Sequence, residues 1–139
     1  MTIKTPSQAV LLKPDELPSY ERGGGAKTTP LVNPSLGSPG FITGYTSFGG
    51  GAEIPFHSHN CEESVVLMEG EAILDIDGQA YPLKAHDVTY VPPNVPHRFR
   101  NQSKTQPMKI MWIYARPDAT RTLTETGVTN PVSAEHIVK

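Results

Sequence analysis

Proline and glycine interrupt this chain so often that long helices are disfavoured along most of its length. The 139 residues include 14 prolines and 12 glycines. Proline removes a backbone donor and glycine loses much conformational freedom in a regular element, so both residues mark turns between short segments. The segments between them are rich in β-branched and aromatic residues, which favour strands. The sequence therefore predicts an all-β chain.

Five segments have the length and composition of strands. They are residues 41–48, 63–68, 71–77, 87–91 and 108–115. Glu69-Gly70 and Asp77-Gly78 are candidate hairpin turns between them. The last segment is apolar on both faces, which predicts a central strand with Trp112 packed in the core. Many short strands at regular spacing are typical of a β-sandwich or a barrel.

Composition limits the binding partners and the cellular compartment that we expect. The length suits one domain, and the formal net charge of −2 gives no electrostatic reason to expect nucleic acid or an anionic membrane as a partner. The single cysteine, Cys61, leaves no internal disulfide and favours a reducing compartment. The longest apolar run, residues 110–115, is far shorter than the roughly 20 residues of a membrane-spanning helix. Without a signal-peptide pattern as well, we expect a cytoplasmic protein.

Three histidines and a glutamate have a spacing that suits a metal site on strands. His57 and His59 are two residues apart, so they point to the same face of a strand. Glu63 follows after a short turn, and His97 supplies a third imidazole from a distant segment. Imidazole and carboxylate ligands together suit one divalent Fe, Mn, Ni, Co or Zn ion better than Ca or Mg. Glu62 is an alternative to Glu63 for the carboxylate.

These residues belong to a motif that resembles the cupin superfamily. Its first motif, G-x5-H-x-H-x3-E-x6-G, is matched at every fixed position, by Gly51, His57, His59, Glu63 and Gly70. Its second motif, G-x5-P-x-G-x2-H-x3-N, is matched at Pro92, His97 and Asn101. His86 and Asn94 replace the two glycines of the second motif, and both residue types tolerate the positive φ that such turns require.

The resemblance implies a double-stranded β-helix, or jelly roll, around one metal pocket. Carried over by position, the metal ligands are His57, His59, Glu63 and His97. The barrel is expected over residues 40–116. Residues 1–39 form an N-terminal extension packing on the barrel or on a partner subunit, with a flexible loop at the glycines 23–25, and residues 117–139 form a C-terminal tail with a short helical turn near 133–138. The resemblance also implies a homodimer that pairs through sheet edges.

Several other residues are candidates for the pocket. Alternation places Phe99 on the His97 face, and Val65 and Leu67 on the Glu63 face. Tyr45, Tyr90 and Tyr114 are weak catalytic candidates, as proton donors or substrate partners, although core packing is the commoner role for a tyrosine.

Other polar groups have simpler interpretations. Arg98 and Arg100 alternate with His97 and so point away from the metal, toward solvent. His86 is interpreted as a surface turn residue and Cys61 as a small buried filler. Glu53 is left open.

The ligand set favours an enzyme. Four protein ligands leave two positions open on an octahedral metal, enough for an oxygen-bearing small molecule, whereas tetrahedral zinc would be closed. We expect a metal-dependent enzyme, with non-haem dioxygenase chemistry ahead of isomerase, lyase or decarboxylase chemistry. The alternative hypothesis is a module that binds a metal or a metabolite without turnover. Motif and fold do not name the reaction.

Overall fold

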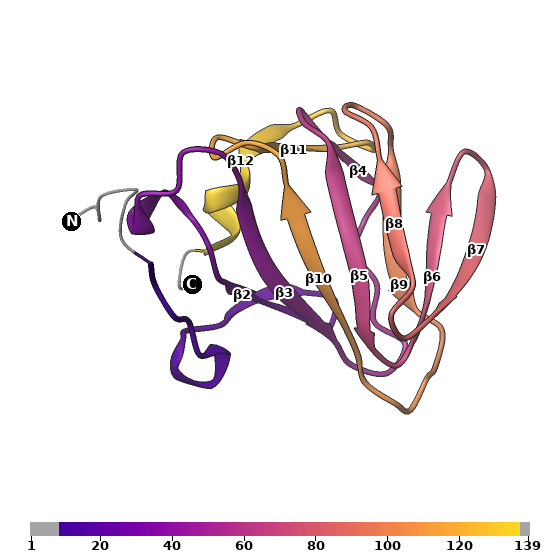
Figure 1. Cartoon of the computed structure of the whole chain (residues 1–139). Helices are drawn as coiled ribbons and strands as arrows, with labels where there is room; N and C mark the ends of the chain where they lie inside the picture. The colour runs from indigo at the N-terminus through magenta and orange to yellow at the C-terminus, as the bar shows by residue number, and fades with distance from the viewer. Residues whose placement is uncertain (1–8, 137–139) are drawn as a thin grey trace.

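The structure is a computed structural model that describes residues 9–136 of the chain, without the side chains of residues 135 and 136. Residues 1–8 of the predicted N-terminal extension and residues 137–139 of the predicted tail lie outside the described part. Over the described part, the protein is all-β and consists of two antiparallel sheets that face each other, as a jelly roll requires (Figure 1).

Each sheet contains six strands. In the first sheet the order is β1-β2-β3-β10-β5-β8. Its strands are β1 (Tyr20–Gly23), β2 (Ala26–Pro30), β3 (Ile42–Phe48), β10 (Met108–Tyr114), β5 (Glu63–Glu69) and β8 (Val88–Val91). In the second sheet the order is β12-β11-β4-β9-β6-β7. Its strands are β12 (Thr129–Pro131), β11 (Thr120–Leu123), β4 (His57–His59), β9 (His97–Asn101), β6 (Glu71–Ile76) and β7 (Gln79–Lys84). All five predicted strands are present, with bounds shifted by one residue or less.

The two predicted hairpin turns have different outcomes. Asp77 and Gly78 both have positive φ and join β6 to β7 as a hairpin, as expected. Glu69-Gly70 is not a hairpin turn, because β5 and β6 belong to different sheets. The chain instead passes here from the first sheet to the second. Gly70 has a φ of 84°, and a Cβ on it would lie 2.4 Å from the Pro107 carbonyl oxygen, so this crossing requires glycine.

Strands outside the predicted barrel segment widen both sheets. The glycines at 23–25 form the turn between β1 and β2 rather than a free loop, and all three have positive φ. From the other end of the chain, β11 pairs with β4 and with β12. The following 3₁₀ helix η3 (Val132–His136) contacts β1 and β2, so the two ends of the described chain meet on one side of the molecule (Figure 1).

The core lies between the sheets and is made of alternate residues from both. Trp112 on β10 packs in it as predicted, with its indole Nε1 donating to Thr46 Oγ1 at 3.0 Å. The indole ring lies directly over Gly44, where a Cβ would be only 2.1 Å from it. Phe48, Leu67 and Phe99 are among the largest fully buried side chains. This packing holds the two sheets at a fixed separation, on which the site depends.

The helices are all short. η1 (Pro14–Glu16) and η2 (Pro34–Leu36) are single 3₁₀ turns, like η3. Within residues 9–136, the structure has no helix whose length and apolar character would let it cross a membrane.

Candidate metal centre

Two neighbouring strands of the second sheet bring the three histidines together. His57 and His59 occupy both ends of β4 and are buried, whereas Ser58 between them points outward. β4 pairs with β9 so that His57 lies directly opposite His97, and directly opposed residues share a face of the sheet. The rings of His57 and His97 have centroids 4.6 Å apart. Alternation on β4 and strand pairing with β9 therefore place three imidazoles on the inner face.

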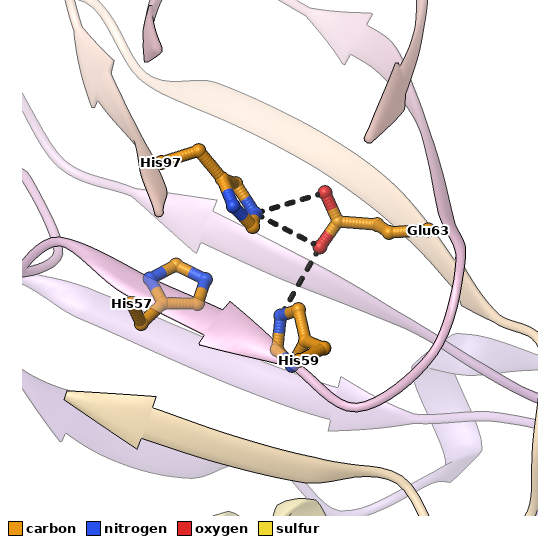
Figure 2. Close-up of side chains that lie close together, drawn as sticks. All are labelled: His57, His59, Glu63 and His97. Carbon is orange, nitrogen blue, oxygen red and sulfur yellow. Dashed lines mark hydrogen bonds and ion pairs between the residues drawn. The ribbon is translucent and has the colours of Figure 1, made fainter. Parts of the chain in front are cut away.

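The carboxylate comes from the opposite sheet. Glu63 begins β5, is 3% exposed, and points across the core at the imidazoles (Figure 2). Its two oxygens lie 3.2 Å from His59 Nε2 and 3.1 Å from His97 Nε2. Glu62 points outward instead and accepts a hydrogen bond of 2.5 Å from the Tyr90 hydroxyl. Parity on β5 therefore places Glu63, and not Glu62, among the histidines.

Backbone carbonyl groups fix the tautomer and the orientation of each imidazole. The Nδ1 atoms of His57, His59 and His97 lie 2.8, 2.9 and 2.9 Å from the carbonyl oxygens of Pro55, Thr120 and Val95. A carbonyl oxygen can only accept, so each Nδ1 carries the proton, and the lone pair of a neutral ring is on Nε2. Metal-binding histidines are commonly oriented in this way: the ring nitrogen that does not bind the metal donates a hydrogen bond to the protein.

Charge in the cluster is tuned by burial and by close contact. Burial raises the pKa of Glu63, but the adjacent imidazoles of His59 and His97 outweigh it and hold that pKa far below its ordinary value. Burial lowers the pKa of His57, and the nearby His97, His59 and Arg121 lower it further. Burial also lowers the pKa of His97, but contact with Glu63 reverses this and raises it. The centre thus contains an ionised carboxylate and at least one neutral imidazole.

The donor set fits one divalent metal ion. One ligand atom from each of the four residues lies within 4.8 Å of the other three, and all four residues are buried. His59 Nε2 and Glu63 Oε1 are buried polar atoms without a hydrogen bond, and each faces another atom of the cluster that carries a lone pair, at 3.2 and 3.1 Å. Lone pairs that converge on one point without a donor between them are expected where a cation sits. The cluster could therefore hold one metal ion.

Both apolar and polar side chains surround the centre. A small inner cavity of about 10 Å³ adjoins His57 and Glu63. Its apolar walls are Ile54, Val65, Phe99, Ile110 and Trp112. This confirms that Phe99 and Val65 face the pocket; Leu67 is buried elsewhere in the core.

The three tyrosine candidates are separated by the fold. Tyr114 lines the inner cavity, with its ring 4.4 Å from that of His59 and stacked on Trp112 at 4.7 Å. Tyr45 alternates to the other face of β3, where Lys109 lies over its ring. Tyr90 is 60% exposed on β8. Of the three, the structure places only Tyr114 at the centre.

The remaining polar candidates lie away from the centre. Arg98 and Arg100 point outward as predicted, yet they are not simply solvated, because both donate to Asp75 at 2.8 Å. Arg98 also pairs with Glu53 at 2.7 Å. Cys61 is buried as expected, and burial raises the pKa of its thiol.

The two replaced glycines of the second motif behave as predicted. His86 and Asn94 have φ of 80° and 65°, the left-handed conformation that glycine would otherwise supply. Asn101, the last residue of that motif, connects two loops: its Nδ2 donates to the carbonyl oxygens of Gly49 and Gln106, and its Oδ1 accepts from the Ser103 amide. The motif thus includes residues that shape turns as well as residues that surround the centre.

Two arginines beside the centre escaped the sequence analysis. Arg22 on β1 and Arg121 on β11 both line the inner cavity. Both lie outside the segment that the two motifs cover. The available signals were weak: Arg22 precedes three glycines, and Arg121 alternates with threonines in a segment expected to be a tail.

Comparison with known proteins identifies the family. The family model described as "Cupin domain" matches residues 44–114, about half of the chain. The chain belongs to the cupin family. Cupin structures agree with the fold: a cupin described as a sugar phosphate isomerase from Silicibacter pomeroyi superimposes with a TM-score of 0.71 at 19% identity, covering 86% of this chain and 85% of that one.

Other proteins that resemble this chain are named for different activities. The "Polyketide synthase CurC" of Streptomyces cyaneus is 35% identical over 86 residues, which are 60% of this chain and 54% of that protein. The chain spans about half the length of the first curated relatives that it matches. The polyketide cyclase RemF of Streptomyces resistomycificus has a TM-score of 0.70 at 17% identity, covering 81% of this chain and 84% of its own. At such identities the structures establish the fold alone.

Proposed function

We propose that this cupin is a metal-dependent enzyme that acts on a small oxygen-bearing organic molecule, with His57, His59, Glu63 and His97 as the metal ligands. The observation that carries the proposal is the orientation of the imidazoles: all three have Nδ1 bonded to a backbone carbonyl, and the Nε2 atoms of His59 and His97 face the Glu63 carboxylate. When bound, a divalent transition metal supplies Lewis-acid polarisation of a substrate oxygen, and iron additionally supplies redox chemistry with dioxygen.

The residues around the centre support chemistry on an enolisable carbonyl compound. The ionised Glu63 leaves about one positive charge on a divalent metal, which favours an oxygen ligand with anionic character. The four ligand residues are buried, so the field of the centre is screened less than it would be at the surface. The Tyr114 ring contacts His59, which makes its phenol the proposed proton donor or acceptor for the bound molecule.

Within this class of reaction we rank proton transfer first, ahead of the dioxygenase chemistry that the sequence led us to expect first. A relative named a polyketide synthase and a structural neighbour named a polyketide cyclase both suggest carbonyl-rich molecules. Dioxygenase chemistry is the second candidate. It is favoured by the two positions that four ligands leave on an octahedral metal, and by similarity to a salicylate 1,2-dioxygenase from Pseudoaminobacter salicylatoxidans, with a TM-score of 0.65 over 30% of that chain.

The test begins with metal content, measured by elemental mass spectrometry on protein purified without a histidine tag. The loaded protein is then given 2,4-pentanedione in D₂O, with α-proton exchange followed by NMR and oxygen uptake by an electrode. Accelerated exchange supports proton transfer, and oxygen uptake supports the dioxygenase. Ligand binding without either would favour a module without turnover.

The double variant His57→Ala/His97→Ala is the control for the metal ligands. We expect it to fold and to lose the metal. Undiminished metal binding in a folded double variant would refute the assignment of the centre.

A further inference from the structure

β4 carries two of the four candidate metal ligands and lies between β9 and β11 in the second sheet (Figure 1). β4 pairs with β9 at one position, where His57 lies opposite His97. On its other edge, β4 pairs with β11 at all three of its residues. β11 lies beyond residues 44–114, which the family model matches, in the segment that the sequence led us to expect as a tail. One edge of the ligand-bearing strand is therefore held by a segment outside that match.

β11 also orients one of the ligands directly. The Nδ1 atom of His59 donates to the carbonyl oxygen of Thr120, the first residue of β11, at 2.9 Å. The other two imidazoles of the centre each donate to the carbonyl group two residues earlier in their own segment. His59 is thus the ligand whose orientation depends on a residue distant in the sequence.

The side chain of Asn60 holds Thr120 in place. β4 ends at His59, and one residue farther along the chain Asn60 continues the contact with β11 through its side chain. Asn60 Oδ1 accepts a hydrogen bond of 2.9 Å from the Thr120 amide, and Asn60 Nδ2 lies 3.5 Å from the carbonyl oxygen of Asp118. Only two soft dihedral angles separate the amide and the carbonyl group of one residue. An amide held by Asn60 therefore limits the directions in which the Thr120 carbonyl can point.

This series of contacts ends at the atom that would bind the metal. While His59 Nδ1 donates to Thr120, the lone pair of the neutral ring is on Nε2. His59 Nε2 lies 3.2 Å from a Glu63 carboxylate oxygen. Without an acceptor at Nδ1, the tautomer protonated at Nε2 becomes favourable, because that proton can be donated to Glu63. A nitrogen that carries a proton has no lone pair for a metal.

We propose that Asn60 is a positioning residue of the metal centre: it holds the Thr120 carbonyl group so that His59 directs the lone pair of Nε2 at the metal. This inference rests on the proposed function, because it takes the cluster of four residues as a metal centre. It gives β11 a role in a site whose ligands all lie on other strands.

The test compares Asn60→Ala with Asn60→Asp in the full chain, with cobalt(II) alone as the probe. Alanine removes the acceptor for the Thr120 amide, whereas aspartate keeps an acceptor oxygen and loses only Nδ2. Replacing an outer partner of a metal ligand weakens metal binding by about 10- to 100-fold. Because Asn60 acts through Thr120, we expect a loss of about tenfold for Asn60→Ala, the lower end of this range. Asn60→Asp should retain most of the affinity, measured by competition with a chelator.

The tautomer of His59 gives a second measurement, which needs no metal. Long-range ¹H–¹⁵N NMR of the histidine rings, recorded above neutral pH, distinguishes a proton on Nδ1 from one on Nε2. The His59 signals are assigned by their absence from the spectrum of His59→Gln. We expect the proton on Nδ1 in the unmodified protein and in Asn60→Asp, and a shift toward Nε2 in Asn60→Ala. His57 should keep its tautomer in all of these proteins, because its carbonyl partner is unchanged.

Asn33→Ala is the matched control. Asn33 Oδ1 likewise accepts a hydrogen bond of 2.9 Å from a backbone amide, that of Ser35, and it caps η2 in a segment that supplies none of the four ligands. This variant should keep both the cobalt affinity and the His59 tautomer. If Asn60→Ala does not fold, as judged by circular dichroism, Asn60→Gln replaces it with the same expectations, because its amide is set one methylene farther out.

Three results would each overturn the proposal. The first is an unchanged cobalt affinity in the folded Asn60→Ala protein, and the second is an unchanged His59 tautomer in that protein. The third is an equal loss of affinity in Asn33→Ala, which would make the effect one of general stability.

Cobalt binding by the unmodified chain separates failure of this inference from failure of the proposed function. A chain that binds no cobalt refutes the metal centre, and the His59 tautomer of metal-free Asn60→Ala still tests the role of Asn60. A chain that binds cobalt equally well with and without the Asn60 side chain refutes this inference alone.

Discussion

Replacing Glu63 with glutamine tests the centre with the smallest change of shape. The amide has the same size as the carboxylate, so the buried packing is kept while the one negative charge among the four ligands is lost. Removal of one partner from a buried charged pair costs about 3–5 kcal/mol. Applied to a bound cation, this weakens metal binding by about 10²- to 10³-fold or more.

The effect is measured as the metal-dependent shift in the thermal unfolding midpoint. A metal at about 100 times its Kd stabilises the native state by ~2.7 kcal/mol. For 139 residues, an unfolding entropy of about 2.1 cal/mol/K per residue converts this to a shift of about 9 °C. At the same cobalt(II) concentration, Glu63→Gln should shift by about 1 °C or less.

Glu62→Gln is the matched control, since Glu62 is the neighbouring carboxylate and points outward to Tyr90. It should retain the full shift. A Glu63→Gln protein that folds and keeps a shift near that of the unmodified protein would refute the reasoning, as would loss of the shift in Glu62→Gln.

Three further predictions concern packing, charge and assembly. Gly44→Ala places a Cβ 2.1 Å from the Trp112 ring, so it should lower the free energy of unfolding in urea by about 1–3 kcal/mol or more. Asp75→Asn should cost about 1–2 kcal/mol at pH 6. Its arginine partners lower the pKa of Asp75 in the folded state. The contribution of Asp75 to the free energy of unfolding is therefore complete above about pH 3.9 and is lost as the pH falls further. The difference in stability between the unmodified protein and Asp75→Asn should shrink in acid. Light scattering should give twice the 15.1 kDa chain mass if the exposed edge strands pair, and a mass of one chain would contradict the homodimer.

Local sequence patterns were sufficient for the strands and for part of the centre. Period-two alternation places His57 and His59 on one face whatever the rest of the fold does, and it separates Glu63 from Glu62 in the same way. Asp77-Gly78 requires positive φ, and so predicts its own hairpin. These features depend on neighbouring residues alone, which is why they can be read without the fold.

At Glu69-Gly70 the local pattern predicted the wrong connection. A turn dipeptide specifies a reversal of the chain, but not which strand the next segment joins. Here β6 pairs with β7 and with β9, which comes from farther along the sequence, and β5 lies in the other sheet.

The sequence alone predicted an all-β chain, because alternation and turn chemistry are local, and the resemblance of its two motifs to the cupins implied the four residues of the centre. Only the tertiary structure decided what surrounds them. Arg22 and Arg121 lie about a hundred residues apart in the sequence. They reach one cavity because a bulge turns one of them and cross-strand pairing places the other. Pairing between distant strands depends on the packing of the whole core, and no local pattern in the chain encodes it.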